Sequence, residues 1–70
     1  MERGATTAEI KEAIQKGSRE PARHGREMCR HNFTFNRTWQ GKHYRIKQVA
    51  PVVIEEANET VVITVYTFYF

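Results

Sequence analysis

Apolar positions near the N-terminus recur at the spacing of one helix face. They are Ile10, Ala13 and Ile14. Thr6 and Glu9 have the spacing of a capping box, in which the threonine side chain caps the third helical amide and the glutamate reaches back to the cap. Gly17 supplies a stop signal. The pattern predicts an amphipathic helix over about residues 7–16 that covers one face of a sheet.

From residue 32 onward the pattern becomes one of alternating apolar and polar positions, which is typical of strands. The predicted strand segments are NFTFN, HYRIKQV, VVIEE and TVVITVYTFYF, separated by turns at QGK and ANE. Pro51 has no N–H to donate, so it requires a bulge or an edge position. The C-terminal segment is apolar on both faces, which predicts a strand in the interior of the sheet because an exposed edge of this kind invites aggregation.

Between the helix and these strands lies the segment SREPARHGREMCRH. Because Pro21 and Gly25 interrupt regular structure, we predict that this segment is a variable basic linker. Residues 26–31 form either a helical turn or the start of a strand. The 70 residues suffice for one domain, residues 1–70. The predicted fold class is α+β, with an N-terminal helix packed on a four-stranded antiparallel sheet.

Charge is concentrated in the middle of the chain. Residues 16–47 carry nine Lys and Arg residues against two glutamates, a net charge of +7, whereas the whole chain carries +3. A clustered basic surface favours a partner that is either a phosphate backbone or an acidic protein. The alternative is that these charges disperse over a solvated surface once the chain folds.

Composition excludes several classes of protein. Cys29 is the sole cysteine, so an internal disulfide is impossible, and no Cys/His cluster has the spacing of a zinc site. We therefore expect neither a metal nor another cofactor. The N-terminus lacks the apolar region of a signal peptide, and the longest apolar run is half the length of a membrane helix. These features predict a cytoplasmic protein with no membrane partner.

The run REPARHGRE…RHNFTFNRTWQGKHYRIKQVAPVVIEEANETVVITVYTFYF resembles the small prokaryotic proteins grouped as domain of unknown function 4258. The resemblance covers almost the whole chain after Gly17. It implies a relation to the RelE, ParE and BrnT toxins, whose core of a helix and an antiparallel sheet is the RelE-like, or barnase-EndoU-colicin-RelE-like, fold. Many of these relatives cut RNA without a metal, so the resemblance implies a toxin of a toxin–antitoxin pair that acts as a ribonuclease on mRNA or tRNA.

Metal-independent cleavage of RNA needs a base for the 2′-hydroxyl proton, a cation for the phosphate charge and an acid for the leaving oxygen. The candidate catalytic residues are Lys47, Tyr66, His43 and His24. The candidate RNA-binding residues are Arg26, Arg30, Lys42, Tyr44, Arg45, Gln48 and Thr64. Each has a plainer interpretation as a solvated surface residue or as packing.

Strand alternation groups some of these candidates. If Val61, Ile63 and Val65 face the helix, Thr64 and Tyr66 share the opposite face. In the segment GKHYRIKQV, residues 41–49, alternation places Tyr44 with Gln48 and Arg45 with Lys47. We predict a polar face that holds the following residues: Lys47, Gln48, Thr64 and Tyr66. A slip of one residue in the strand register would exchange Lys47 for Gln48 on that face.

A second hypothesis is that the chain has no catalytic activity. No unmistakable catalytic constellation is present in the sequence, which favours a module that binds RNA or an acidic protein, or a ParE-like inhibitor of another enzyme. A small structural subunit is a further alternative. The aromatic C-terminus YTFYF supports a homodimer, because small domains often gain stability by pairing.

Overall fold

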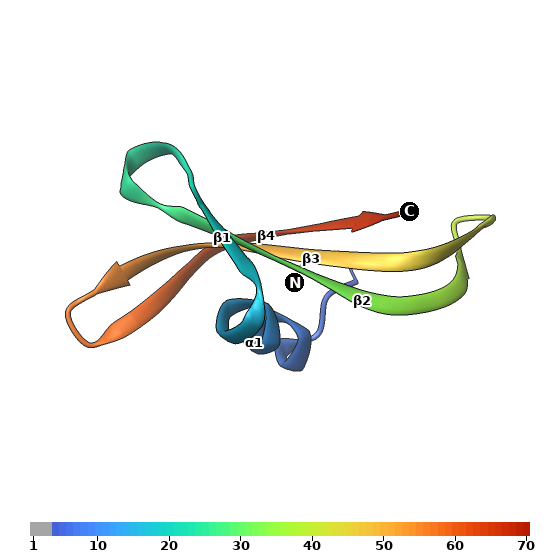
Figure 1. Ribbon diagram of the computed structural model, residues 1–70, viewed down its shortest axis with the longest axis horizontal. Coiled ribbons are helices and arrows are strands. Elements are labelled where there is room, and N and C mark those ends of the chain that lie inside the picture. The colour runs from blue at the N-terminus through green and yellow to red at the C-terminus, as the bar shows by residue number, and fades with distance from the viewer. Residues whose placement is uncertain (1–3) are drawn as a thin grey trace.

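The structure is a computed structural model that describes residues 4–70. Over these residues the chain forms α1 (Thr7–Lys16), β1 (Ser18–Pro21), the short 3₁₀ turn η1 (Arg23–Gly25), β2 (Glu27–Trp39), β3 (Lys42–Glu56) and β4 (Glu59–Tyr69). The four strands are antiparallel and lie in the order β1-β2-β3-β4. Helix α1 packs on one face of this sheet, and η1 rises above the other (Figure 1). The predicted α+β arrangement is confirmed.

The helix begins and ends as the sequence predicts. Thr6 Oγ1 accepts a hydrogen bond from the Glu9 amide at 3.1 Å, and Glu9 Oε1 accepts one from the Thr6 amide at 3.0 Å. Gly17 follows the last turn, where a Cβ atom would lie 2.5 Å from the Ala13 carbonyl oxygen and 2.6 Å from that of Arg30. Glycine therefore permits the close approach of the helix end to β2.

The β2–β3 connection is a two-residue hairpin turn. Gln40 and Gly41 have φ angles of 52° and 82°, and positive φ at both central positions is the geometry that suits the twist of a hairpin. The expected turn at QGK is thus present. Residues 43–49 and 52–56, predicted as separate strands, belong to the single strand β3. The sheet still has four strands, because β1 forms from the segment predicted to be a linker. The sequence gives no indication of this strand, since it is four residues long and ends in a proline.

Pro51 lies in an interior strand, where proline is unusual because it cannot donate to a ladder. The register of β2 against β3 pairs Met28 with Val52 and resumes at His31 with Val49, so no partner is assigned to Pro51 on that side. On its other side Pro51 pairs with Val65 of β4. The gap in the β2 ladder accommodates the missing N–H, and it lets β3 continue through the proline.

Strand β4 lies at the edge of the sheet, and the prediction of an interior position is wrong. The register against β3 shifts between Val52 and Val53, which leaves Ile63 as an extra residue in β4. This bulge reverses the alternation of side chains, as bulges do. Val65 is buried against the helix as predicted, but Val62, rather than Ile63, lines the helix side of the strand.

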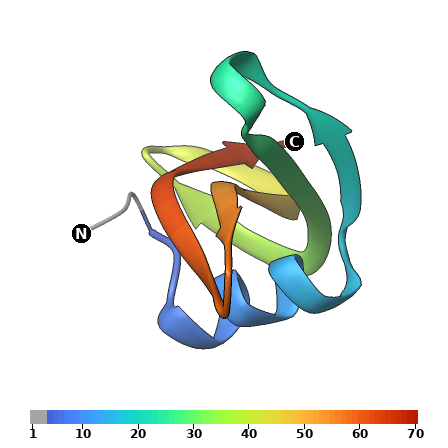
Figure 2. The ribbon, with the colours of Figure 1, turned by 90° about the vertical axis from the view of Figure 1, so that its left-hand side faces the viewer.

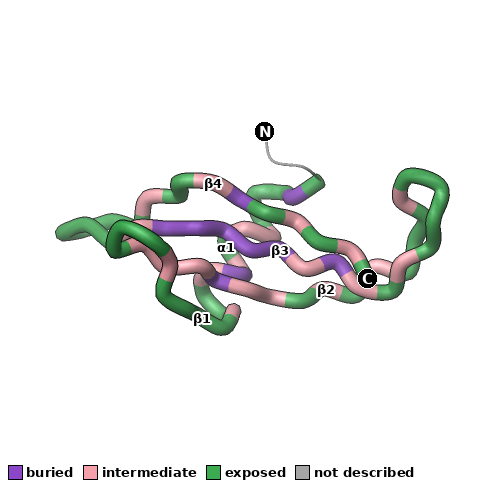
Figure 3. The backbone as a smooth tube through the Cα atoms, turned by 90° about the horizontal axis from the view of Figure 1, so that it is seen from above, coloured by how far each residue is buried: buried purple, intermediate pink, exposed green. Residues whose placement is uncertain are grey.

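The core is thin and consists of small side chains. Ala5, Ala13, Val49 and Val65 form a buried cluster with Ile10 and Phe33 packed against it. Figure 2 shows the twisted sheet with the helix beneath one face, and Figure 3 shows the buried positions running along the middle of β3. Among residues 4–70, no helix has the length and apolar character needed to cross a bilayer.

A charged residue lies within this core. Lys47 of β3 is 5% exposed, and its Nζ donates to Glu9 Oε1 at 2.8 Å and to the Gly4 carbonyl oxygen. Burial acts to raise the pKa of Glu9, but the hydrogen bonds from Lys47 and from the Thr6 amide outweigh it, so the pKa lies below its ordinary value of 4.5. The ionised pair is therefore the favoured state of the folded protein.

This pair makes stability depend on pH. A carboxyl whose pKa is lower in the folded than in the unfolded chain contributes stability above pH 4.5, and that contribution is lost as the pH falls through its folded pKa. We predict that Glu9→Gln loses about 1–3 kcal/mol at pH 7, because it leaves the Lys47 ammonium without its counter-charge. Urea unfolding from pH 7 to pH 3 measures this loss, and it should shrink below pH 4.5. Glu56→Gln, at an exposed site, is the control. Equal losses at every pH would contradict the assignment.

Candidate functional site

The two faces of the sheet differ in what covers them. The helix α1 covers one face, and within residues 4–70 only the short η1 turn rises above the opposite one, near one end of the sheet (Figure 1). We call this opposite surface the open face. Its principal side chains are Arg30, Asn32, Gln48, Thr64, Tyr66 and Phe68. They come from β2, β3 and β4, so strand pairing alone brings them together.

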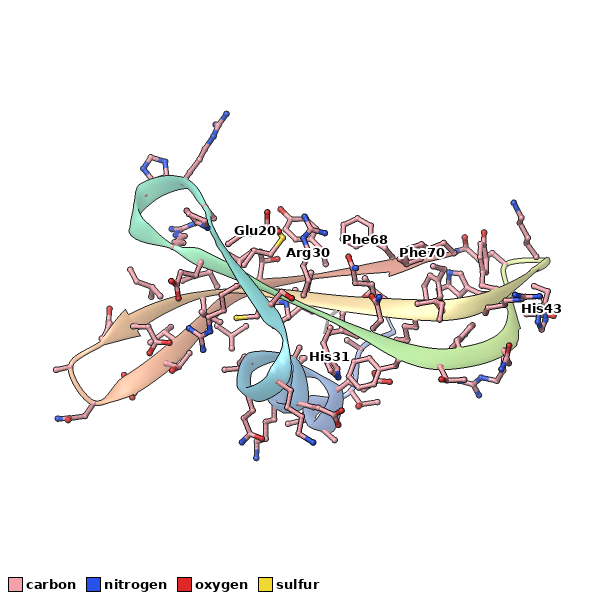
Figure 4. The ribbon with its side chains drawn as sticks, viewed as in Figure 1. Glu20, Arg30, His31, His43, Phe68 and Phe70 are labelled. Carbon is pink, nitrogen blue, oxygen red and sulfur yellow. The ribbon has the colours of Figure 1, made fainter. Side chains whose placement is uncertain are left out.

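Arg30 is the centre of a polar network on the open face. Its Nε donates to a carboxylate oxygen of Glu20 in β1, and its Nη1 donates to Gln48 Oε1 at 2.9 Å. Gln48 Nε2 in turn donates to Asn32 Oδ1 at 2.9 Å. These bonds join three strands and fix the guanidinium above the sheet (Figure 4).

Aromatic rings lie next to this network. The Arg30 guanidinium carbon is 5.8 Å from the centre of the Phe68 ring, within the range of a cation–π interaction. The Tyr66 and Phe68 rings follow one another along β4 with centres 6.3 Å apart and an interplanar angle of 19°. The exposed fractions of Tyr66, Phe68 and Phe70 are 45%, 43% and 56%. Large rings are usually buried, so a row of exposed ones is a feature that needs an explanation.

A shallow hollow of about 220 Å³ lies at the η1 end of the open face. Arg23 and Arg26 line one side of it, and Thr64 and Tyr66 line the other. The grouping of Thr64 with Tyr66 on the face away from the helix is therefore confirmed. His24 lies in the η1 turn between the two arginines and is exposed, with φ of 60°.

The structure does not place Lys47 on this face. Lys47 pairs in register with Tyr69 and points under the helix toward Glu9, whereas Gln48 occupies the open face. The predicted grouping of Lys47 with Thr64 and Tyr66 is wrong. The reason is the long-range ion pair, which holds Lys47 on the covered side of β3.

The candidate catalytic residues do not converge. His43 lies next to the β2–β3 turn and His24 lies in η1, near opposite ends of the sheet (Figures 1 and 4). Tyr66 is on the open face, and Lys47 is on the covered one. No single substrate group can therefore contact all four side chains.

The predicted placement of Tyr44 with Gln48 is also wrong. The amides of Arg45 and Ile46 both donate to the Phe70 carbonyl oxygen, an irregularity that breaks the alternation of β3. Tyr44 consequently packs against Tyr69, with ring centres 5.7 Å apart. This aromatic cluster of Phe35, Trp39, Tyr44 and Tyr69 is distinct from the open face. Lys42 lies over the Tyr44 ring, and Arg45 is exposed nearby, so these basic residues belong to the hairpin end.

Several residues of the open face were not among the candidates predicted from the sequence. They are Phe68, Asn32, Glu20 and Arg23. The position of Phe68 could have been predicted from the sequence. Thr64, Tyr66 and Phe68 are spaced by two residues, so in a regular strand all three lie on the same face. The role of Glu20 could not have been predicted, since it depends on β1 pairing with β2 through a four-residue strand.

Cys29 is not a reactive group of this site. It is fully buried on β2, and burial raises the pKa of its thiol. A buried thiol of high pKa is a poor nucleophile and a poor metal ligand. Over the described residues, no group of three His, Cys, Asp or Glu side chains is placed to hold a metal ion.

Cys29 therefore reports on folding. We predict that a disulfide reagent such as DTNB modifies it at least about 100-fold more slowly in the native protein than in 6 M guanidinium chloride at pH 8, because both burial and the raised pKa suppress the thiolate. Absorbance of the released thiolate measures both rates. Equal rates would mean that the β1–β2 region is open in solution.

No family model matches the chain, and no curated protein or solved structure matches it either. The resemblance described above stays a prediction, and function is inferred from the chemistry of the open face.

Proposed function

We propose that this protein binds single-stranded RNA on its open face. The observation that carries the proposal is the row of exposed rings, Tyr66, Phe68 and Phe70, beside the fixed guanidinium of Arg30. Unpaired bases stack on aromatic side chains and on arginine, and any base has a π-face for this contact. A sheet surface with rings in line is suited to successive bases of one strand.

Charge supports the same ligand. Arg23 and Arg26 line the hollow at one end of the ring row, and Arg30 lies beside it. Lys and Arg contacts to phosphates supply most of the sequence-independent affinity for nucleic acids. Gln48 and Asn32, already joined by a hydrogen bond, add amide groups that can donate to or accept from base edges. The open face thus offers stacking, phosphate contact and polar base contact together.

We predict that the double substitution Tyr66→Ala and Phe68→Ala weakens binding of a fluorescent poly-pyrimidine RNA 10-mer by about 30-fold or more, since each of the two stacked bases contributes about 1–3 kcal/mol. Fluorescence anisotropy at 50 and 200 mM salt measures both affinity and its salt dependence. The affinity of the wild-type protein should fall as salt rises.

Val62→Ala is the matched control, because Val62 is a comparably exposed apolar residue of β4 that lines the helix side. It should bind RNA like the wild-type protein. If the double variant keeps its fold and binds with unchanged affinity, the rings are not the binding platform and the proposal fails.

A second candidate function, cleavage of RNA by a toxin, has one specific observation in its favour. Tyr66 lines the 220 Å³ hollow together with Arg23 and Arg26. Two guanidinium groups can stabilise charge that develops on a phosphate, and a phenol hydroxyl can donate a proton to a leaving oxygen. The hollow contains no His side chain among its lining residues, although His24 lies in the adjoining turn.

Tyr66→Phe separates the two functions, because it keeps the ring and removes the hydroxyl. For a ribonuclease we expect RNA binding within about twofold of wild type but cleavage reduced by roughly 10²-fold or more, the range of a lost general acid. The measurement is formation of a 2′,3′-cyclic phosphate end on a labelled RNA, with growth of bacteria that express the protein as a second readout. Binding by the wild-type protein without any cleaved product would contradict the toxin hypothesis and leave a non-catalytic binding module.

The predicted partners follow from these alternatives. A toxin requires an antitoxin protein that covers its basic residues. A binding module requires only its RNA or acidic protein ligand, and a ParE-like inhibitor requires the enzyme that it inhibits. A homodimer and a cytoplasmic location stay predictions, as does a role as a structural subunit. The uncovered edge of β4, which is a long apolar strand, is the surface that supports pairing with a second copy.

A further inference from the structure

A second and larger hollow lies where the end of α1, the start of β1 and the edge of β2 meet. We call it the corner pocket. Its volume is about 410 Å³. It is lined by Lys16, Ser18, Arg30, His31, Asn32 and Gln48. It exists because β1 pairs with β2 only as far as Arg30, opposite Ser18, so the β2 edge is uncovered beyond that point.

The lining of the corner pocket suits an anion. It contains a lysine, an arginine and a histidine together with a hydroxyl and two carboxamides, and it contains no carboxylate. Two glutamates contact lining residues but do not themselves line the pocket. Glu20 accepts from Arg30 Nε, and Glu12 lies 3.2 Å from His31 Nε2 on the helix side. Among residues 4–70, no hydrogen-bond or ion-pair partner is assigned to the Lys16 ammonium.

Lys16 has a plainer role as well. It lies in the last turn of α1, where a cation interacts favourably with the helix dipole. That role requires only a positive charge near the helix end. It does not account for a pocket whose other lining groups are donors from β1, β2 and β3, nor for the absence of an acidic side chain among them.

Arg30 connects the corner pocket to the ring row. Its guanidinium lines the pocket and also lies 5.8 Å from the Phe68 ring centre. Its Nε and Nη1 have partners, which leaves Nη2 without an assigned partner within the described part of the chain. A base on Phe68 would therefore have its own or the adjacent phosphate beside this pocket.

Resting on the proposed RNA-binding function, we infer that the corner pocket binds a phosphate of the strand whose base stacks on Phe68. The pocket is the size of a small-ligand site. Lys16 supplies a positive charge, Arg30 a guanidinium held by Glu20 and Gln48, and Ser18, Asn32 and Gln48 neutral hydrogen-bonding groups. The ligand class is a nucleotide, whose phosphate enters the pocket while its base stacks on Phe68. A nucleoside lacks this phosphate.

The test compares AMP with adenosine on the ¹⁵N-labelled full-length protein. We expect AMP to shift the amide signals of Ser18 and Asn32 and the side-chain amide of Gln48 in a saturable manner, and adenosine to leave them in place. Lys16→Gln should weaken AMP binding by roughly tenfold, as expected for loss of one charged hydrogen bond. Lys11→Gln, which removes the same charge from α1 at a residue lining a different hollow, should leave it unchanged.

RNA binding provides the second arm. Lys16→Gln should reduce the slope of log affinity against log salt by about 1, as for one lost phosphate contact, while Lys11→Gln keeps the wild-type slope. Suppose that RNA binding depends on the rings, but AMP does not shift the amide signals of the pocket and Lys16→Gln does not change the salt slope of RNA binding. The inference is then overturned and the proposed function stands. If AMP titrates the pocket while RNA does not bind, the pocket is a phosphate site and the proposed function fails. If neither ligand binds, both are overturned.

Discussion

The ion pair between Lys47 and Glu9 determines how the rest of this small structure is arranged. Lys47 lies on the interior strand β3 and is 5% exposed, so its ammonium needs a counter-charge close by. Glu9 provides it with the same oxygen that completes the capping box with Thr6. One carboxylate therefore serves both the start of the helix and its attachment to the sheet. A helix placed on the other face would put Glu9 out of reach of Lys47 and leave the lysine side of β3 open to solvent.

A single helix covers a single face, and the two faces have different residues as a result. The covered side is packed by small residues, with Val49, Val65 and Ala13 at its centre. On the open face Ala50 and Val52 are also buried; Ala50 pairs with Tyr66 of β4, and Val52 pairs with Met28 and Thr64. Rings that would stabilise a second layer of the fold are instead exposed to solvent. This is the arrangement expected where a ligand supplies the missing cover.

Local features of the fold could be predicted from the sequence, whereas features that depend on distant contacts could not. The capping box at Thr6 and the hairpin turn at Gly41 each depend on a few neighbouring residues, and both are present. The side on which Lys47 lies is decided by a carboxylate 38 positions away. Alternation assigns a face to each strand residue only while the ladder is regular. The extra residue at Ile63 reverses it in β4, and the irregularity that follows Tyr44 reverses it in β3.

The same network that fixes Arg30 also limits what it can contact. Glu20 and Gln48 hold two of its nitrogen atoms, so a ligand does not have to order a flexible side chain before it binds. Glu20 partly neutralises the guanidinium, which weakens attraction to phosphates at long range. What remains is a directional donor beside the Phe68 ring and next to the Lys16 ammonium. We therefore expect this site to bind a ligand that carries both a base and a phosphate more tightly than a ligand that carries a negative charge alone.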